Sequence, residues 1–160
     1  MARAIVPGSF DPVTKGHLDI IERAATMFES VIVAIARNSS KTPMFTLAER
    51  VEMLVEACAP WPNVEIDSFQ GLLVNYAVEH QAGVIVKGLR AVSDFEYELQ
   101  MALMNRRLNR KVETVFLMTG AEYSYLSSSI VKEIARLGGA VEGLVSPNVE
   151  KRLRAKVANP

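Results

Sequence analysis

A histidine that directly follows a glycine ends the stretch of residues 5–17, which reads IVPGSFDPVTKGH. The apolar run stops at residues 7–8, and an amphipathic pattern of helical spacing begins at Leu18, so a strand, a loop and a helix are predicted. The N-terminus of that helix, with Gly16 and His17, favours phosphate through its unpaired N–H groups and partial positive charge. Gly16 would let a ligand approach the backbone, and His17 could donate to a phosphoryl oxygen as charge builds there. A tight turn with a histidine that caps the helix explains the same residues, and this chemistry alone does not decide between the two.

Three more segments carry groups that favour phosphate, and each follows an apolar run. Lys41 follows the run 31–36, residues 87–90 (KGLR) follow 84–86, and residues 123–129 (YSYLSSS) follow 115–118. The serines at the end of the last segment open a predicted helix; taken alone, they are explained by helix capping. Together the four segments indicate ligands with several phosphates. Phosphoryl or nucleotidyl transfer needs mainly positioning and charge stabilisation, so a protein nucleophile need not be present.

The elements that must position these segments alternate between strand and helix. Short apolar strands without strong alternation indicate a parallel sheet covered on both faces. We therefore predict an α/β fold, a doubly wound (Rossmann-like) five-stranded parallel sheet, in a single domain over residues 1–160. The strand at 64–67 should lie near an edge, because one of its sides is polar. Ligands of such sheets bind at the carboxyl ends of the strands, where all four segments lie.

Local signals set the predicted helix boundaries. Residues 46–49 (TLAE) and 93–96 (SDFE) have the pattern of a capping box, residues 72–80 are helical, and the helix from 130 to 137 should stop at Gly138-Gly139. Ser146 and Pro147 fit an N-cap and the first position of a last helix.

Composition excludes several classes of protein. The 160 residues are 49% hydrophobic and 7% aromatic, which is typical of an ordinary folded protein. Lys plus Arg and Asp plus Glu are both 18, so no overall field attracts nucleic acid or a membrane surface. The single cysteine, Cys58, excludes an internal disulfide and is expected to be buried filler. We see no signal peptide and no membrane span, and expect a cytoplasmic protein.

The motifs of other phosphate and acyl chemistries are missing. The first strand is followed by no Gly-x-Gly-x-x-Gly, and the chain contains no Walker loop and no Gly-x-Ser-x-Gly elbow. The only histidines are His17 and His80, and His80 is explained by its place at a helix end, so a two-histidine metal site is disfavoured.

Residues 8–12 (GSFDP) and 14–17 (TKGH) resemble the [Thr/Ser]-x-Gly-His motif of the nucleotidylyltransferase superfamily, and the serine triplet resembles its C-terminal signature. A closer similarity covers nearly the whole chain and is to the bacterial phosphopantetheine adenylyltransferase family. It rests on residues 41–45 (KTPMF), 87–90 (KGLR), 94–98 (DFEYE) and 123–129 (YSYLSSS).

The resemblance implies a reaction and a set of site residues. The family transfers AMP from ATP to 4′-phosphopantetheine, giving dephospho-coenzyme A and pyrophosphate, with Mg²⁺ bound along with ATP. By motif position, the catalytic residues would be His17, Lys41 and Arg90. The acceptor would be bound by Ser9, Lys41, Leu73 and Lys87. ATP would be bound by Ser9, Phe10, His17, Gly88, Leu89, Arg90, Glu98, Tyr123, Ser124, Tyr125, Leu126, Ser127, Ser128 and Ser129. Lys87, where some relatives have arginine, keeps the charge but loses bidentate geometry.

The resemblance also implies a homohexamer and feedback by coenzyme A. Met101 and Met104 could supply an interface, although they would serve equally well in a core. Two rival functions remain: another nucleotidylyltransferase, acting on nicotinate mononucleotide or using CTP, and a nucleotide-binding module without turnover. The lysine and arginine loops disfavour the first, and the combination of His17, Lys41 and Arg90 disfavours the second.

Overall fold

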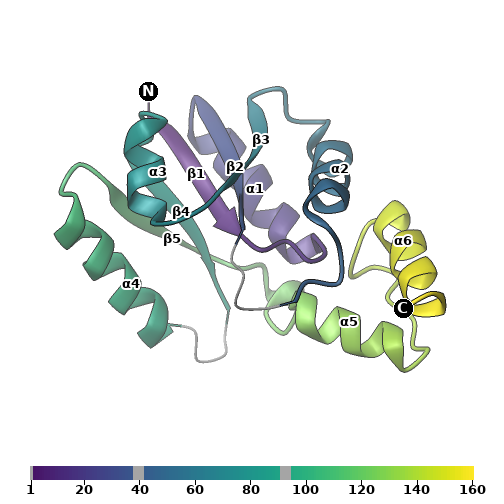
Figure 1. The fold of residues 1–160 in the computed structure, drawn as a ribbon. Coiled ribbons are helices and arrows are strands. Elements are labelled where there is room, and N and C mark those ends of the chain that lie inside the picture. Colours follow the sequence, from purple (N-terminus) through teal and green to yellow (C-terminus); the bar gives the residue numbers. More distant parts are fainter. Residues whose placement is uncertain (1, 38–41, 91–94) are drawn as a thin grey trace.

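The computed structural model describes residues 2–37, 42–90 and 95–160, and its centre is a parallel five-stranded sheet (Figure 1). The strand order is β3-β2-β1-β4-β5, so the direction of winding reverses between β1 and β4. The predicted fold class is confirmed, and β3 lies at an edge as expected. The strands are β1 (Arg3–Gly8), β2 (Ser30–Ala36), β3 (Val64–Phe69), β4 (Val84–Leu89) and β5 (Glu113–Met118).

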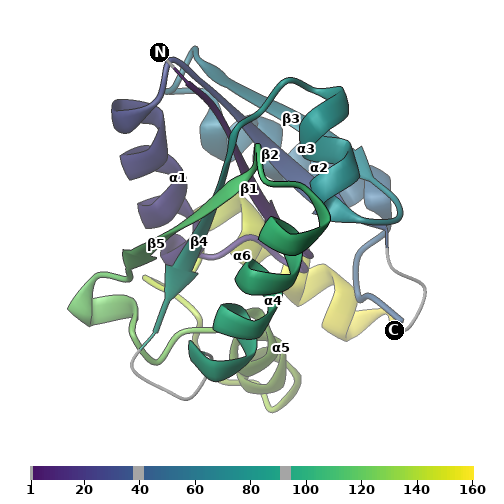
Figure 2. The same ribbon diagram turned by 90° about the vertical axis from the view of Figure 1, so that its left-hand side faces the viewer.

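Helices cover both faces of the sheet, as Figures 1 and 2 show, with α1 and α2 on one side and α3 and α4 on the other. The helices are α1 (Lys15–Met27), α2 (Leu47–Cys58), α3 (Leu73–Glu79), α4 (Phe95–Leu108), α5 (Ser128–Arg136) and α6 (Pro147–Ala158), with a 3₁₀ turn, η1 (Ala121–Tyr123). The last two helices extend beyond the sheet, where Arg152 and Lys156 of α6 form ion pairs with Glu52 and Glu49 of α2.

Two apolar cores lie on the two faces of the sheet, because successive side chains of a strand point to opposite faces. They pack the sheet against the helices on each side. In β2, Val31, Val33 and Ile35 join the core with α1 and α2, whereas Ile32 and Ala34 join the core with α3. Cys58 is buried in the first core, as predicted. Both faces of the sheet are therefore packed against helices, and the loops of the site extend from the ends of its strands.

The local signals place the helix boundaries well where the structure describes them. Thr46 and Glu49 form the expected capping box of α2, and Ser146 caps α6 with Pro147 in its first turn. Gly138 follows α5 with a φ of +77°, in the left-handed region that favours glycine. Several boundaries differ: α5 begins at Ser128 rather than 130, β3 continues to Phe69, and β5 begins at Glu113. In addition, β4 continues to Leu89, because residues 84–89 pair with 113–118. The capping pattern at 93–96 falls partly outside the described residues.

Within the described ranges, no helix combines the length and the apolar character needed to cross a membrane.

Candidate active site

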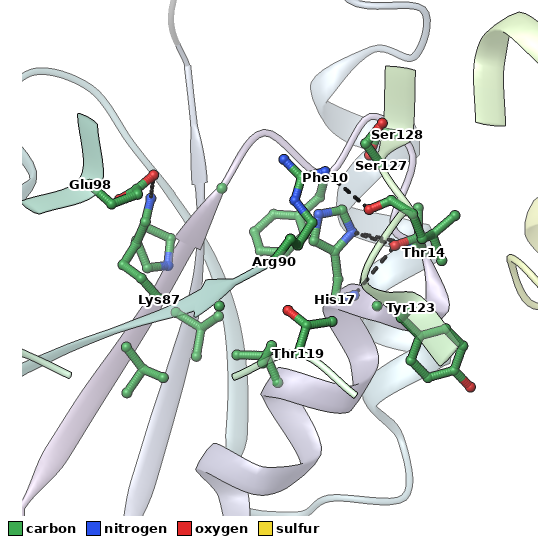
Figure 3. A pocket seen from close by; sticks show the side chains of 18 residues that line it. Phe10, Thr14, His17, Lys87, Arg90, Glu98, Thr119, Tyr123, Ser127 and Ser128 are labelled. Atoms are coloured by element: carbon green, nitrogen blue, oxygen red, sulfur yellow. Dashed lines mark hydrogen bonds and ion pairs between the residues drawn. The ribbon is translucent and has the colours of Figure 1, made fainter. Parts of the chain in front are cut away.

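A cavity of about 280 Å³ lies at the carboxyl ends of β1 and β4, where the winding of the sheet reverses. Parallel α/β sheets bind their ligands at this position, because the loops of neighbouring strands diverge there. We name it the His17 cavity; its polar lining consists of Thr14, His17, Lys87, Arg90, Glu98, Thr119, Tyr123, Ser127 and Ser128 (Figure 3). Three loops that are far apart in the sequence thus meet around one space.

The first turn of α1 fixes the ring of His17. Thr14 is the N-cap and accepts from the backbone N–H of His17, while the N–H of Thr14 donates to His17 Nδ1 at 2.9 Å. Since Nδ1 accepts this hydrogen bond, it carries no proton, and the proton of the neutral ring is on Nε2. The sequence left open whether His17 caps the helix or serves a ligand. The structure shows that it caps the helix with one nitrogen and keeps the other as a donor.

The surroundings of His17 keep its ring neutral. Burial, and next the positive charge of Arg90, lower the pKa of His17 to about 4. The ring of Phe10 packs edge-on against it, with 5.0 Å between the ring centroids. At neutral pH His17 is therefore an uncharged hydrogen-bond donor, suited to an oxygen on which negative charge develops.

Arg90 and the N-terminus of α5 form the cationic side of the cavity. Arg90 Nη1 donates to the carbonyl oxygen of Leu126 at 3.1 Å, which ties the end of β4 to the segment before α5. Ser127 is the N-cap of α5, and its hydroxyl accepts from Ile130 N. A guanidinium and the first N–H groups of a helix suit phosphate oxygens.

Lys87 and Glu98 separate the His17 cavity from a second cavity of about 220 Å³. Lys87 Nζ lies 3.3 Å from Glu98 Oε1 (Figure 3). Both residues line both spaces. We name the second space the α3–α4 cavity. Its remaining lining is mainly apolar and consists of Phe69, Gly71, Leu72, Leu73, Ile85, Tyr97, Met101, Ala102, Asn105 and Thr114.

Most, but not all, of the predicted site residues line these cavities. The predicted residues that line the His17 cavity are Phe10, His17, Lys87, Gly88, Arg90, Glu98, Tyr123, Leu126, Ser127 and Ser128. Leu73 lines the α3–α4 cavity. The lining does not include Ser9, Leu89, Ser124, Tyr125 and Ser129. Lys41 lies outside the described residues.

Some lining residues were not predicted. Thr14 was noticed only as part of a motif, although its N–H orients His17. Thr119 follows β5 and lines the cavity; its position after an apolar run was the signal that could have identified it. Gly88 was predicted as a ligand contact, but it also has a packing role: a Cβ there would lie 2.9 Å from Ile20 Cγ1.

In the described part of the chain, no group of three His, Cys, Asp or Glu side chains is arranged to hold a metal ion.

Comparison with known proteins connects this geometry to a family. The cytidylyltransferase-like family profile matches residues 5–134. A phosphopantetheine adenylyltransferase of Carboxydothermus hydrogenoformans is 60% identical over 156 residues, which is 98% of this chain and 96% of that protein. The phosphopantetheine adenylyltransferase of Geobacter sulfurreducens is 54% identical over 157 residues, covering 98% and 96% of the two chains.

A solved structure shows the same fold. It is a Vibrio parahaemolyticus protein assigned as a nicotinate-nucleotide adenylyltransferase, with a TM-score of 0.73, coverage of 100% of this chain and 98% of that one, and 15% identity. Identity that low supports the fold alone. The matches over nearly the whole length go further, and the chain belongs to the cytidylyltransferase-like family and, within it, to the phosphopantetheine adenylyltransferases.

Proposed function

We propose that the protein transfers AMP from ATP to 4′-phosphopantetheine, giving dephospho-coenzyme A and pyrophosphate. The observation that carries this function is 54–60% identity to phosphopantetheine adenylyltransferases over nearly the whole chain. The geometry agrees with it. A polar cavity with a histidine donor and a guanidinium adjoins an apolar cavity of a size suited to a flexible arm.

The reaction requires one bond to form and one to break. An oxygen of the acceptor phosphate attacks the α-phosphorus of ATP, and the bond from that phosphorus to the bridging oxygen of the β-phosphate breaks, releasing pyrophosphate. No protein nucleophile takes part. His17 Nε2–H donates to an α-phosphate oxygen, and stabilises the charge that grows there as the acceptor attacks.

The remaining residues position the two substrates. Arg90 and the N-terminus of α5, with residues 127–129, hold the β- and γ-phosphates, and Phe10, Gly88 and residues 123–126 surround the nucleotide. Glu98 and Leu89 complete the ATP site.

On the acceptor side, Ser9, Lys41 and Lys87 hold the phosphate, and Leu73 lines the arm in the α3–α4 cavity. Lys87 is ion-paired with Glu98, so the acceptor phosphate must compete with this carboxylate for the Lys87 ammonium.

Mg²⁺ enters with ATP in this proposal. Magnesium is usually held by substrate phosphates with one or two carboxylates and water, and the phosphate oxygens of ATP supply most of that set. Its contribution is to neutralise charge on the transferring phosphates. Chelation by EDTA should abolish turnover, and added Mg²⁺ should restore it.

The assembly is proposed to be a homohexamer in the cytoplasm. The support for an oligomer is α4, whose apolar side chains Phe95, Tyr97, Leu99, Met101, Leu103, Met104 and Leu108 are all exposed. Apolar patches of this kind mark interaction surfaces. Light scattering after gel filtration tests the stoichiometry, and a monomer at micromolar concentration would contradict it.

Feedback by coenzyme A is part of the same proposal. Coenzyme A contains both an adenosine part and a pantetheine arm, so it can reach into both cavities at once. Competition of coenzyme A against each substrate in steady-state kinetics tests this, and the absence of inhibition would refute it.

The reaction itself is tested by pyrophosphate release from Mg-ATP, with and without 4′-phosphopantetheine, and with nicotinate mononucleotide as a control acceptor. Release only with phosphopantetheine, together with dephospho-coenzyme A in the mass spectrum, is the expected result. Replacement of ATP by CTP should stop the reaction. Binding of ATP without release in either case would point to a nucleotide-binding module.

A further inference from the structure

The carboxylate of Asp11 lines neither cavity, but it connects its own loop to two other elements near the site. Its side chain is buried, with a residue exposure of 6%. Oδ1 accepts from Phe45 N at 2.9 Å, and Oδ2 accepts from Met44 N at 2.9 Å and from Lys132 Nζ at 2.9 Å. One carboxylate thus joins the loop between β1 and α1, the segment that enters α2, and helix α5.

The residues on either side of Asp11 are held by the same elements. The carbonyl oxygen of Ser9 accepts from Arg50 Nη1 of α2 at 2.9 Å. The carbonyl oxygen of Pro12 accepts from the hydroxyl of Ser128, in the first turn of α5, at 2.7 Å. The loop between β1 and α1 is therefore tied to both α2 and α5 through Asp11 and its neighbours.

This loop contains a backbone conformation that needs such support. Phe10 has a φ of +48°, in the left-handed region that is unfavourable for a bulky residue. The ring of Phe10 is buried and packs against the ring of His17. A shift of Asp11 would therefore be transmitted through Phe10 to the histidine that faces the nucleotide.

The charge of Asp11 matters as well as its shape. Burial by itself raises the pKa of Asp11, but the hydrogen bonds from Lys132 and from the N–H groups of Phe45 and Met44 outweigh it and lower the pKa below its usual 3.8. Asp11 is therefore ionised at neutral pH and accepts three hydrogen bonds. An amide in its place would lose the charge and would turn a donor towards one of these partners.

We propose that Asp11 is a positioning residue for adenylyl transfer. It holds residues 44–45, which lead into α2, at a fixed distance from His17 and from the α5 helix on the nucleotide side. The inference rests on the proposed function. Asp11 is not among the residues that line either cavity, so it acts through Phe10, His17 and α5 rather than by touching a substrate. Displacement of reacting groups by about 1 Å can lower a rate about a hundredfold, which is the kind of loss this residue prevents.

The test compares steady-state kinetics and melting temperatures of Asp11→Asn, Lys132→Gln and Lys132→Arg with those of the wild type. For Asp11→Asn we expect kcat to fall on the order of tenfold to a hundredfold, with a smaller fall for Lys132→Gln. The double variant should be little worse than Asp11→Asn alone, because both changes break the same contact. Lys132→Arg keeps a positive charge beside this carboxylate, so its kcat should be closer to that of the wild type than to that of Lys132→Gln.

A matched control is Asp67→Asn. Asp67 also accepts from a backbone N–H and from a side chain, those of Ser68 and Tyr76, but these partners lie in β3 and α3 and not in the elements that hold His17. Its change should lower the melting temperature and leave kcat and both KM values as they are. A purely structural role for Asp11 would give the same pattern.

The outcomes separate this inference from the function on which it rests. A wild type that makes no dephospho-coenzyme A refutes both. An active wild type, with Asp11→Asn within about twofold of its kcat, refutes the positioning role alone. If Asp11→Asn does not fold, the lysine variants decide: equal kcat for Lys132→Gln and the wild type overturns the proposal.

Discussion

The two cavities of this protein share Lys87 and Glu98 but are built in different ways. The His17 cavity is enclosed by loops that hydrogen bonds hold in place, such as Thr14 N to His17 Nδ1 and Arg90 to the carbonyl oxygen of Leu126. The α3–α4 cavity is lined mainly by apolar side chains such as Leu73 and Met101. The first kind of wall fixes the direction of donors, whereas the second only offers apolar surface.

This difference separates two tasks that a transfer reaction must perform. Stabilisation of developing charge requires donors that are already oriented, because reorientation during the reaction costs free energy. Binding of a flexible arm requires surface and volume, and tolerates small shifts. Changes in the His17 cavity should therefore act on kcat, and changes in the α3–α4 cavity on the KM of the acceptor.

The largest effect is expected from His17→Ala. Loss of a preorganised donor to the transition state lowers kcat on the order of a hundredfold to a thousandfold, with little change in ATP affinity. Single-turnover kinetics and calorimetry with ATP measure the two quantities. His80→Ala is the matched control, since His80 lines neither cavity, and should keep the wild-type kcat. A loss of ATP affinity as large as the loss of kcat would show that His17 binds ATP in the ground state. The two cavities would then not divide binding and catalysis as proposed.

Gly88→Ala tests how tightly the wall of the His17 cavity is packed. The added Cβ would lie 2.9 Å from Ile20 Cγ1 of the buried face of α1. Such overpacking should lower the free energy of unfolding by about 1–3 kcal/mol, measured by urea denaturation. In an Ile20→Ala background the same change should cost much less, because the clashing atoms are gone. If Gly88→Ala lowers the free energy of unfolding equally in both backgrounds, the contact with Ile20 is not the cause of the loss.

Leu73→Ala should act on the acceptor alone. Removal of apolar contact from the α3–α4 cavity should raise the KM for phosphopantetheine roughly tenfold, with kcat and the KM for ATP nearly unchanged. Leu137→Ala, which removes the same atoms from an exposed position after α5, is the control. A fall in kcat with unchanged KM would mean that this wall also orients the reacting phosphate.

The smallest change is expected in the pH dependence of the rate. Because the pKa of His17 is about 4 rather than 6.5, kcat should show no limb from His17 as the pH falls through 6.5. The same shift has a consequence for stability. Between about pH 6.5 and 4 the unfolded chain binds a proton at His17 that the folded chain does not, so stability falls on acidification across this window.

Acid unfolding checks that consequence, with His17→Asn as the comparison. The loss of stability across this window should be smaller in the variant, because the unfolded chain no longer takes up that proton. A kcat limb near 6.5 that disappears in the variant would show that the ring is not held neutral.

Much of the fold could be predicted because its signals are local. The buried strands, the capping box at Thr46 and Glu49, and the glycine after α5 each depend on residues within a few positions of one another. The edge position of β3 was predicted from its polar side. The start of α5 was misplaced by two residues, since Ser127 rather than a later serine is the N-cap.

The site was predicted as a set of segments, not as an arrangement. Their common location follows from the rule that parallel strands end at one edge of the sheet. Which side chains face the cavity could not be predicted in the same way. Within 123–129, Tyr123 and Ser127 line the cavity while Tyr125 is exposed, and this depends on η1 and the turn that follows it.

The sequence by itself determined the class of fold, the strand ends that carry the site, and the chemistry that histidine, cations and serines make available there. The tertiary structure decided how those groups are oriented. The proton of His17 is on Nε2 because a backbone N–H occupies Nδ1, and Asp11 contacts Met44 and Lys132, which are 33 and 121 residues away. The physical reason is that propensities and caps act over a few residues, whereas a hydrogen bond between distant loops exists only once the sheet has brought their strand ends together.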